Sequence, residues 1–315
     1  MLSRAADNLY WMARYMERAE NVARILDVAY RMSLLPGDER QQHTQWESAI
    51  IIAGCEDAYE AIGGRFDAEG VIGFLALDPL NPSSIRSSLH AARENARAMR
   101  AQITSEMWES LNSTWIEARG LDSAALKARG AREYFDWVKE RSHLFRGVTS
   151  GTMQRDEPYR FVRLGGFLER ADATARILDV KYHVLLPSPA DVGGVVDYYQ
   201  WTAILRSVSA FRAYRKIYRD VITPMRVAEL LILRPDMPRS LLACMIEIER
   251  ILTDLRALYG RDYQSTRFAA SMCSRLRYGK MEAIFEQGLH EYLTETIDHN
   301  VELGSAIARD FMRPG

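Results

Sequence analysis

Residues 17–30 read ERAENVARILDVAY, and residues 169–182 read ERADATARILDVKY. Ten of the 14 positions are identical at a constant shift of 152, and Glu20 is matched by the acidic Asp172. Chance does not produce agreement of this length, so the two stretches indicate an internal duplication. Because both carry aliphatic residues at helical spacing, we expect each to form a long helix.

Further landmarks repeat in the same order. The segment FLALDPLNPSSI (74–85) matches LLILRPDMPRSL (230–241) at a shift of 156, and both prolines and one serine are retained. At a shift of 155, Trp46 and Tyr59 match Trp201 and Tyr214. We therefore predict one domain over residues 1–315, built from repeat units near 1–151 and 152–315. Such a unit is far longer than a solenoid repeat of about 20 to 50 residues.

The spacing of apolar residues predicts an all-α fold. One side of the first helix carries Leu9, Met12, Met16, Ala19, Val22, Ala23 and Leu26, and the opposite side carries Tyr10, Arg14, Glu17, Asn21 and Arg24. Ser84 follows Pro82 and predicts the start of another helix, from about residue 85 to 111. No sustained strand-like alternation is present. We predict a helical bundle of about eight to twelve helices in two similar halves.

Charge and composition exclude several classes of protein. The chain has 41 basic and 42 acidic residues, so it has no overall cationic field for general nucleic-acid binding. No apolar run approaches the roughly 20 residues of a membrane span, and the N-terminus does not resemble a secretion signal. Three widely spaced cysteines fit buried thiols. We expect a cytoplasmic protein that binds neither nucleic acid nor membrane.

The segment GVTSGT (147–152), followed by MQRDEP, separates the two predicted units. Small residues before a helix N-terminus can form an amide nest for an anion, with Thr149, Ser150 and Thr152 as hydroxyl donors. The alternative interpretation is a plain interhelical loop.

No nucleotide-binding or zinc-hydrolase motif is present, and no recognisable motif predicts a bound cofactor. Glu140 and His143 form one Glu-x-x-His pair, whereas carboxylate-bridged di-iron bundles need two such pairs and two further glutamates. We expect no metal, and we expect His143 to be solvated or to cap a helix.

Two sets of charged residues are candidates for a site. The first set is repeated in both predicted units and comprises Glu17, Arg18, Glu20, Arg24, Asp27, Glu169, Arg170, Asp172, Arg176 and Asp179. Packing alone does not require the same charges at the same places. Either these residues form ion pairs that fix how helices cross, or they line a polar cleft between the halves.

The second set is a cationic line of Arg86, His90, Arg93, Arg97 and Arg100, whose spacing places all five on one helical stripe. These like charges need acidic partners, such as the face of Glu17, or an anionic ligand. A solvated stripe produced by an arginine-rich composition remains an equal alternative.

The opening LSRAADNLYWMARYMERAENVARILDV resembles the bacterial alpha-E family. The resemblance continues through ARENARAMRAQITSEMWESLN (92–112), TMQRDE (152–157) and LERADATARILDVKY (168–182) to LLILRPDMPRSL. It implies a component of systems that also contain circularly permuted ATP-grasp proteins and transglutaminase-like peptidases, with a role in making or modifying amide or peptide bonds. The chain departs from the family pattern at residues 164–166, which read LGG rather than LGR.

Motif matching to this family implies a set of site residues: Arg4, Asn8, Tyr10, Arg14, Glu17, Arg18, Glu20, Arg93, Glu94, Asn95, Arg97, Arg155, Asp156, Glu157, Glu169, Arg170 and Asp172. Our leading hypothesis is a helical partner of an ATP-grasp-type ligase. An Arg and Glu cleft would hold a carboxylate-bearing substrate or intermediate, and the partner would use the ATP.

Two alternatives remain open. In the first, the chain is itself an amide-bond-forming or hydrolysing enzyme with Glu17 or Glu169 as the base. In the second, the repeated charges are purely structural.

Overall fold

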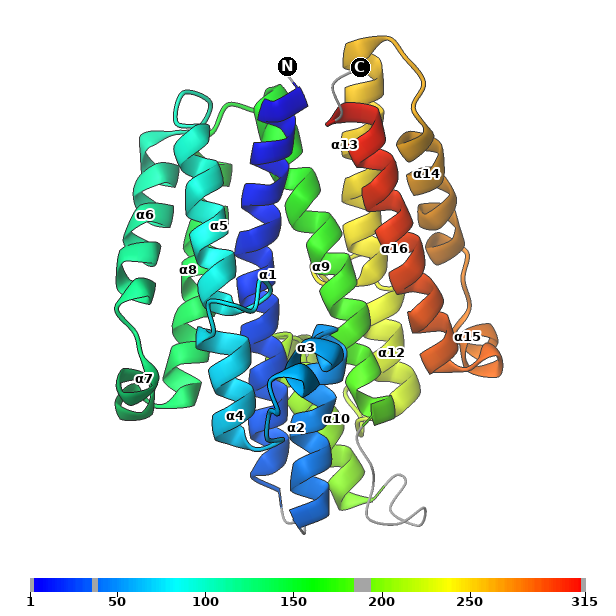
Figure 1. Ribbon diagram of the computed structural model, residues 1–315. Coiled ribbons are helices and arrows are strands. Elements are labelled where there is room, and N and C mark those ends of the chain that lie inside the picture. The colour runs from blue at the N-terminus through cyan, green and yellow to red at the C-terminus, as the bar shows by residue number, and fades with distance from the viewer. Residues whose placement is uncertain (1–2, 36–38, 184–193, 313–315) are drawn as a thin grey trace.

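The computed structural model describes residues 3–35, 39–183 and 194–312. These residues form an all-α bundle, and they include no strand, as predicted (Figure 1). The elements are α1 (Ser3–Ser33), α2 (Glu39–Ala53), α3 (Glu56–Ala61), α4 (Ala68–Ile72), the π-helical turn η1 (Gly73–Leu77), α5 (Ile85–Ala98), α6 (Ser105–Arg119), α7 (Ser123–Arg129), α8 (Ala131–Thr152), α9 (Glu157–His183), α10 (Val195–Ser207), α11 (Phe211–Tyr218), α12 (Pro224–Ile232), α13 (Leu241–Tyr259), α14 (Gln264–Arg277), α15 (Met281–Gln287) and α16 (Leu289–Phe311).

The number of helices exceeds the prediction of eight to twelve because several connections contain short helices of their own. α3, α4, α7 and α15 each span seven residues or fewer. They join the longer helices rather than adding layers to the bundle.

Two long helices cross the centre of the molecule side by side. Figure 1 shows α1 in blue beside α9 in green, with α5, α6 and α8 on the side of α1 and α13, α14 and α16 on the side of α9. The predicted helix at the N-terminus is confirmed, since α1 has 31 residues. Its predicted polar side does not face solvent: Tyr10, Glu17, Asn21 and Arg24 are all buried. Because α1 contacts helices on several sides, its polar residues need partners inside the protein.

Close contact between α1 and α9 depends on a glycine. A Cβ atom added at Gly165 would lie 2.2 Å from the backbone oxygen of Tyr10. Asn21 donates a side-chain hydrogen bond to the carbonyl oxygen of Glu169 at 3.3 Å across the same contact. The absence of a side chain at Gly165 therefore lets the two backbones approach.

A new helix begins at the end of each of the two matching proline-containing segments, 74–85 and 230–241. Ser84 caps α5 by accepting a hydrogen bond from the amide of Ser87, and Ser240 caps α13 in the same way from Ala243. The expected single helix over residues 85–111 is wrong, because it is interrupted between α5 and α6. Thr104 caps α6, and the chain turns back there so that α6 packs against α5.

The interpretation of GVTSGT (147–152) as a loop or an anion nest is also wrong. These residues form the last turns of α8, and the buried Thr149 donates its hydroxyl to the carbonyl oxygen of Phe145. A helix C-terminus presents carbonyl oxygens rather than free amide groups, so this segment has the wrong polarity for an anion.

The internal duplication stays a prediction, although matched positions make matched contacts. Tyr59 donates its hydroxyl to the carbonyl oxygen of Arg65, and Tyr214 donates to that of Val221. The connection between α8 and α9 also falls where the two repeat units were expected to meet.

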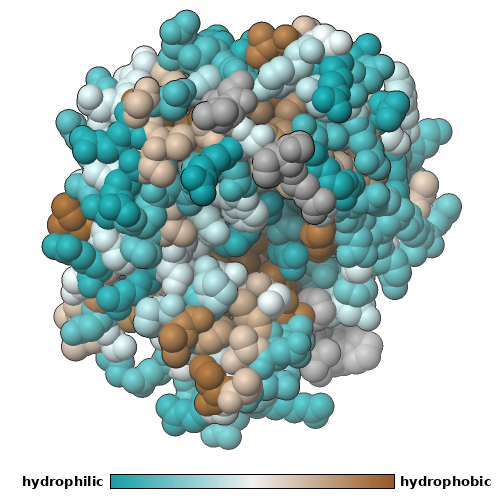
Figure 2. All heavy atoms as spheres, turned by 45° about the horizontal axis from the view of Figure 1, so that its top comes forward, coloured by the Kyte–Doolittle hydropathy of each residue, from teal (hydrophilic) through white to brown (hydrophobic). Residues whose placement is uncertain are grey.

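The surface seen in Figure 2 is mostly hydrophilic, with scattered hydrophobic patches and a hollow near its middle where hydrophobic residues lie deeper. Within the described ranges, no helix is long and apolar enough to cross a membrane.

Candidate functional site

Three glutamates lie buried where α1 and α9 meet. Glu17 and Glu20 come from α1 and Glu169 from α9, and their exposed fractions are 2%, 0% and 5%. Isolated carboxylates at such depth would be costly, so each must be paired with cations and hydrogen-bond donors. Arginines from four parts of the chain supply these partners.

Glu169 is held by two arginines of α1. Arg14 Nε lies 2.7 Å from Glu169 Oε2, and Arg18 donates from Nε to Oε1 at 2.7 Å and from Nη2 to Oε2 at 3.2 Å. Burial raises the pKa of Glu169, but the charges of Arg14 and Arg18 outweigh it, and the net pKa lies below its ordinary value.

Glu17 is held in a reciprocal manner from α9. Arg170 donates from Nε and Nη2 to the two carboxylate oxygens of Glu17, at 2.9 Å each. Arg146 of α8 adds a contact of 2.7 Å from Nη1, and Arg239 adds one of 3.2 Å from Nη2. Burial raises the pKa of Glu17, but the positive charges of Arg170 and Arg146 have the larger effect and lower the net pKa to about 2. Glu17 is therefore ionised at neutral pH.

Glu20 completes the cluster. It pairs with Arg24 at 2.7 Å and also contacts Arg146 and Arg239, and Nε2 of His143 lies 3.6 Å away. Despite burial, which raises the pKa of Glu20, these partners hold it well below its ordinary value. The expectation of a solvated or helix-capping His143 is incomplete, because this half-exposed imidazole contacts the carboxylate.

Guanidinium groups outnumber carboxylates in this cluster. The three glutamates pair directly with six arginines, Arg14, Arg18, Arg24, Arg146, Arg170 and Arg239. Burial, together with the charges of Arg24 and Arg170, lowers the pKa of Arg239 to about 10. Nη1 of Arg239 is buried without a hydrogen-bond partner. The cluster thus carries excess positive charge.

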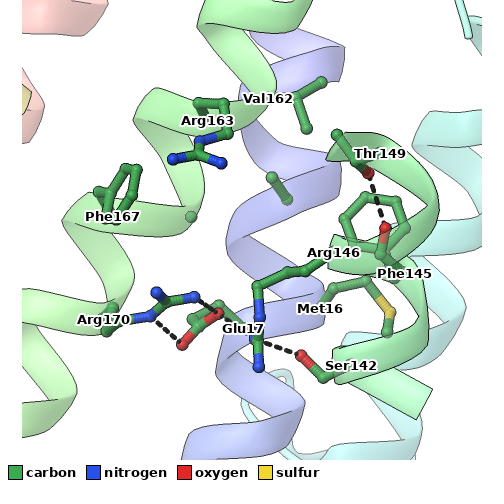
Figure 3. Close-up of a pocket in the computed structure, with 12 residues that line it drawn as sticks. Met16, Glu17, Ser142, Phe145, Arg146, Thr149, Val162, Arg163, Phe167 and Arg170 are labelled. Atoms are coloured by element: carbon green, nitrogen blue, oxygen red, sulfur yellow. Dashed lines mark hydrogen bonds and ion pairs between the residues drawn. The ribbon is translucent and has the colours of Figure 1, made fainter. Parts of the chain in front are cut away.

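A cavity of about 100 Å³ opens beside this cluster, between α1, α8 and α9. In Figure 3, Arg146 and Arg170 converge on Glu17 from opposite sides, and Arg163 lies on the α9 wall. The remaining wall is largely apolar, with Met16, Phe145, Val162 and Phe167 among its residues. Three guanidinium groups and one carboxylate therefore meet a largely apolar space.

Gly166 accounts for part of this space. The shift of 152 that relates Glu17 to Glu169 relates Arg14 to Gly166, where the resemblance stated above implies an arginine. A Cβ atom added at Gly166 would meet no atom within 4 Å, and Gly166 lines the cavity. Arg146 contacts Glu17 here, much as Arg14 contacts Glu169. An arginine from α8 thus supplies the guanidinium that α9 lacks.

The structure brings together seven predicted site residues: Tyr10, Arg14, Glu17, Arg18, Glu20, Glu169 and Arg170. Asp172 lies apart, paired with Arg176 at 2.7 Å. Asp156 accepts a hydrogen bond from the amide of Tyr159 at the start of α9, and Arg155 is exposed beside a second cavity. The exposed start of α1 holds Asn8, bonded to the carbonyl oxygen of Arg4.

The cationic line does not reach the buried cluster. Arg93 pairs with Glu94 and Asn112, and Arg97 pairs with Glu94 at 2.7 Å. The side chain of Asn95 donates to the carbonyl oxygen of Ala91. These residues lie on the side of α5 toward α6 and solvent, because Leu89, Ala92 and Ala96 form its buried side. The suggested pairing of this line with the face of Glu17 is wrong.

Sequence reasoning missed Arg146, Arg163 and Arg239. Arg146 could have been found from its spacing, since it lies four residues after the buried Ser142, whose hydroxyl accepts its hydrogen bond. Arg239 directly precedes Ser240, the N-cap of α13, but no local pattern places Arg239 against Glu20, which lies 219 residues away in the chain.

No group of three or more His, Cys, Asp or Glu residues suited to a metal ion is found in the part of the chain that the structure describes. The two glutamates of α1 face arginines instead, as detailed above.

Comparison with known proteins identifies relatives of the whole chain. The sequence is 24% identical over 319 residues to the uncharacterized proteins Rv2567 and MT2643 of Mycobacterium tuberculosis and Mb2597 of Mycobacterium bovis. These alignments cover 93% of the chain but only 35% of each relative, so the chain spans about a third of their length. No solved structure gives a significant match.

Residues 1–312 match the Alpha-E family, described as a predicted alpha-helical domain with a conserved ER motif. Two Glu-Arg dipeptides, Glu17–Arg18 and Glu169–Arg170, pair reciprocally across the centre of this bundle. With a match over nearly its full length, the chain belongs to the Alpha-E family.

Proposed function

We propose that the cavity beside Glu17 binds the carboxylate of a small ligand, and that the chain presents this ligand as the helical partner of an ATP-grasp-type ligase. The observation that carries the binding step is the excess of guanidinium groups around the cavity. Arg146, Arg163 and Arg170 face one carboxylate there. Guanidinium groups bind carboxylates through paired, charge-assisted hydrogen bonds.

The size of the cavity limits the ligand. A volume of about 100 Å³ holds only a few water-sized groups. The apolar wall formed by Met16, Phe145 and Phe167 suits a short hydrocarbon portion next to the charged group. The terminal carboxylate and last side chain of a peptide, or a small amino acid, match these dimensions.

The geometry favours binding over base catalysis by the glutamates. A general base works best when its pKa lies near the working pH. The pKa of Glu17 is lowered to about 2, and that of Glu169 is also lowered, since each faces at least two arginines. Both carboxylates are therefore suited to hold arginines in place and poorly suited to accept a proton at neutral pH.

The binding step can be tested with a variant that fills the cavity. Gly166→Arg places a side chain where the structure leaves room, and Gly151→Arg is the matched control at another open helical glycine outside the cavity. The probe is the dipeptide Ala-Ala, compared with its C-terminal amide by isothermal titration calorimetry. We expect Gly166→Arg to abolish Ala-Ala binding and Gly151→Arg to retain it, and the amide to bind at least about tenfold more weakly.

Equal binding of the acid and the amide would disprove the carboxylate assignment. So would the lack of saturable binding to the wild-type protein. The partnership is tested separately, by co-elution with a purified ATP-grasp-type ligase and by the rate of ATP turnover with and without the chain. If neither changes, the partnership is wrong even when the cavity binds carboxylates.

A further inference from the structure

A second cavity, of about 430 Å³, lies beside the first and is larger and more polar. It is formed by the start of α9 and the middle of α13. Arg163 lines both cavities. Its guanidinium lies over the ring of Phe167 on one side and near the hydroxyl of Tyr159 on the other.

Positive charge is in excess in the second cavity. Its charged residues are Arg155, Arg160, Arg163, Arg250, Glu247 and Asp254, which are four guanidinium groups and two carboxylates. The excess is therefore two positive charges. This balance differs from that of an ordinary surface network of matched pairs.

Arg250 pairs closely with Glu247, at 2.9 Å, but the other two arginines that pair in this cavity lie farther from their carboxylates. Nε of Arg160 lies 3.6 Å from Asp254, and Nη2 of Arg163 lies 3.4 Å from Glu247. Nε of each of these two arginines is buried and has no hydrogen-bond partner. Buried donors of this kind are rare unless another group satisfies them. The two side chains are about three-quarters shielded from solvent, with exposed fractions of 26% and 29%.

We propose that the second cavity binds the phosphoryl group of a phosphate monoester. A phosphate monoester carries a charge close to two at neutral pH and offers three acceptor oxygens. This charge matches the excess in the cavity, and the oxygens can accept hydrogen bonds from the guanidinium groups that line it. The volume exceeds that of a phosphoryl group and lies in the range of small-molecule sites, so it also accommodates the organic part of the ester.

The assignment goes beyond carboxylate binding and does not depend on it. Arg160 and Arg250 line only the second cavity, whereas Gly166 lines only the first. Substitutions at these positions therefore separate the two sites.

The experiment measures binding of glycerol 3-phosphate and of inorganic phosphate by isothermal titration calorimetry at about 0.15 M salt, which screens loose surface attraction. The proteins are the wild type, Arg160→Gln, Arg250→Gln and the control Arg226→Gln. Arg226 is a partly exposed arginine on α12 that pairs with Asp220 at 2.6 Å and lies outside both cavities.

We expect glycerol 3-phosphate to bind the wild type and Arg226→Gln equally, and to bind Arg160→Gln and Arg250→Gln at least about tenfold more weakly. Gly166→Arg should leave this binding unchanged. Equal affinity of all the proteins for glycerol 3-phosphate would overturn the site. Inorganic phosphate binding as tightly as the ester would overturn the assignment to a monoester and point to free phosphate.

Discussion

Glu20 shows how a single buried charge can hold several elements together. Its side chain is fully buried and contacts arginines of α1 and α8 and Arg239, which precedes α13. Glu20 and Arg24 lie four residues apart in the sequence, a spacing at which opposite charges pair on one helix. The sequence did not predict the other two arginines, because they approach from elements far away in the chain.

Replacement of Glu20 by glutamine is therefore expected to destabilise the protein strongly. The substitution leaves buried guanidinium groups without their carboxylate, and breaking a buried pair in this way costs about 3–5 kcal/mol. Glu94→Gln is the control, because Glu94 pairs with Arg93 and Arg97 near the surface, where such pairs contribute about 0–1 kcal/mol. Urea unfolding at pH 7 gives both values. Similar losses for the two variants would contradict the structural role of Glu20.

Glu17 should make the free energy of unfolding depend on pH. Its pKa falls from an ordinary 4.5 to about 2 in the folded protein, so the folded state favours the ionised carboxylate. The resulting stabilisation is present above about pH 4.5 and is lost as the pH falls toward 2. We expect Glu17→Gln to show a shallower decline in the free energy of unfolding across this range. Urea titrations at successive pH values measure it, and Glu56→Gln controls for loss of an exposed carboxylate. An unchanged slope in Glu17→Gln would refute the prediction.

At the scale of helices, local signals in the sequence predicted where a helix begins better than where a helix is interrupted. Ser84 caps its helix as expected, and the matching Ser240 does the same, since a serine at this place offers its oxygen to the first amides of the helix. The segment 147–152 was misread as a loop because its glycines suggest a break. In the structure Gly147 and Gly151 lie on the exposed side of α8, where packing by the buried side maintains the helix.

The adjacent glycines of α9 provide a test of how α1 and α9 pack. In Gly165→Ala the new methyl group would collide with the backbone of Tyr10, and such overpacking costs about 1–3 kcal/mol. In Gly166→Ala the methyl group meets open space, so the better helix propensity of alanine should stabilise the protein by about 0.5–1 kcal/mol. Thermal and urea unfolding compare the two variants. Equal effects would mean that the helices do not approach as closely as the structure indicates.

At the scale of the whole molecule, buried ion pairs join the two predicted repeat units. Glu17 belongs to the first unit, but Arg170 and Arg239 belong to the second. α1 also packs along α9 through most of its length. The units therefore depend on one another for both apolar burial and charge compensation.

We expect a fragment of residues 1–152 not to fold cooperatively when expressed alone. Its glutamates would lack the arginines of the second unit, and the apolar side of α1 that faces α9 would meet water. Near-ultraviolet circular dichroism and thermal unfolding would detect this. A cooperative, native-like transition in the fragment would show that the chain consists of two separable domains rather than one.

Local patterns in the sequence were sufficient for the all-α class, the long helices at 17–30 and 169–182, the helix start at Ser84 and the choice of the repeated Glu-Arg pairs as candidates. Helical periodicity and capping act over a few residues, so a single sequence contains them. The buried position of the polar side of α1, the contribution of Arg146 and Arg239, and the cavity at Gly166 depended on tertiary packing. They arise from contacts between residues more than 100 positions apart, whose alignment is set only when the helices pack.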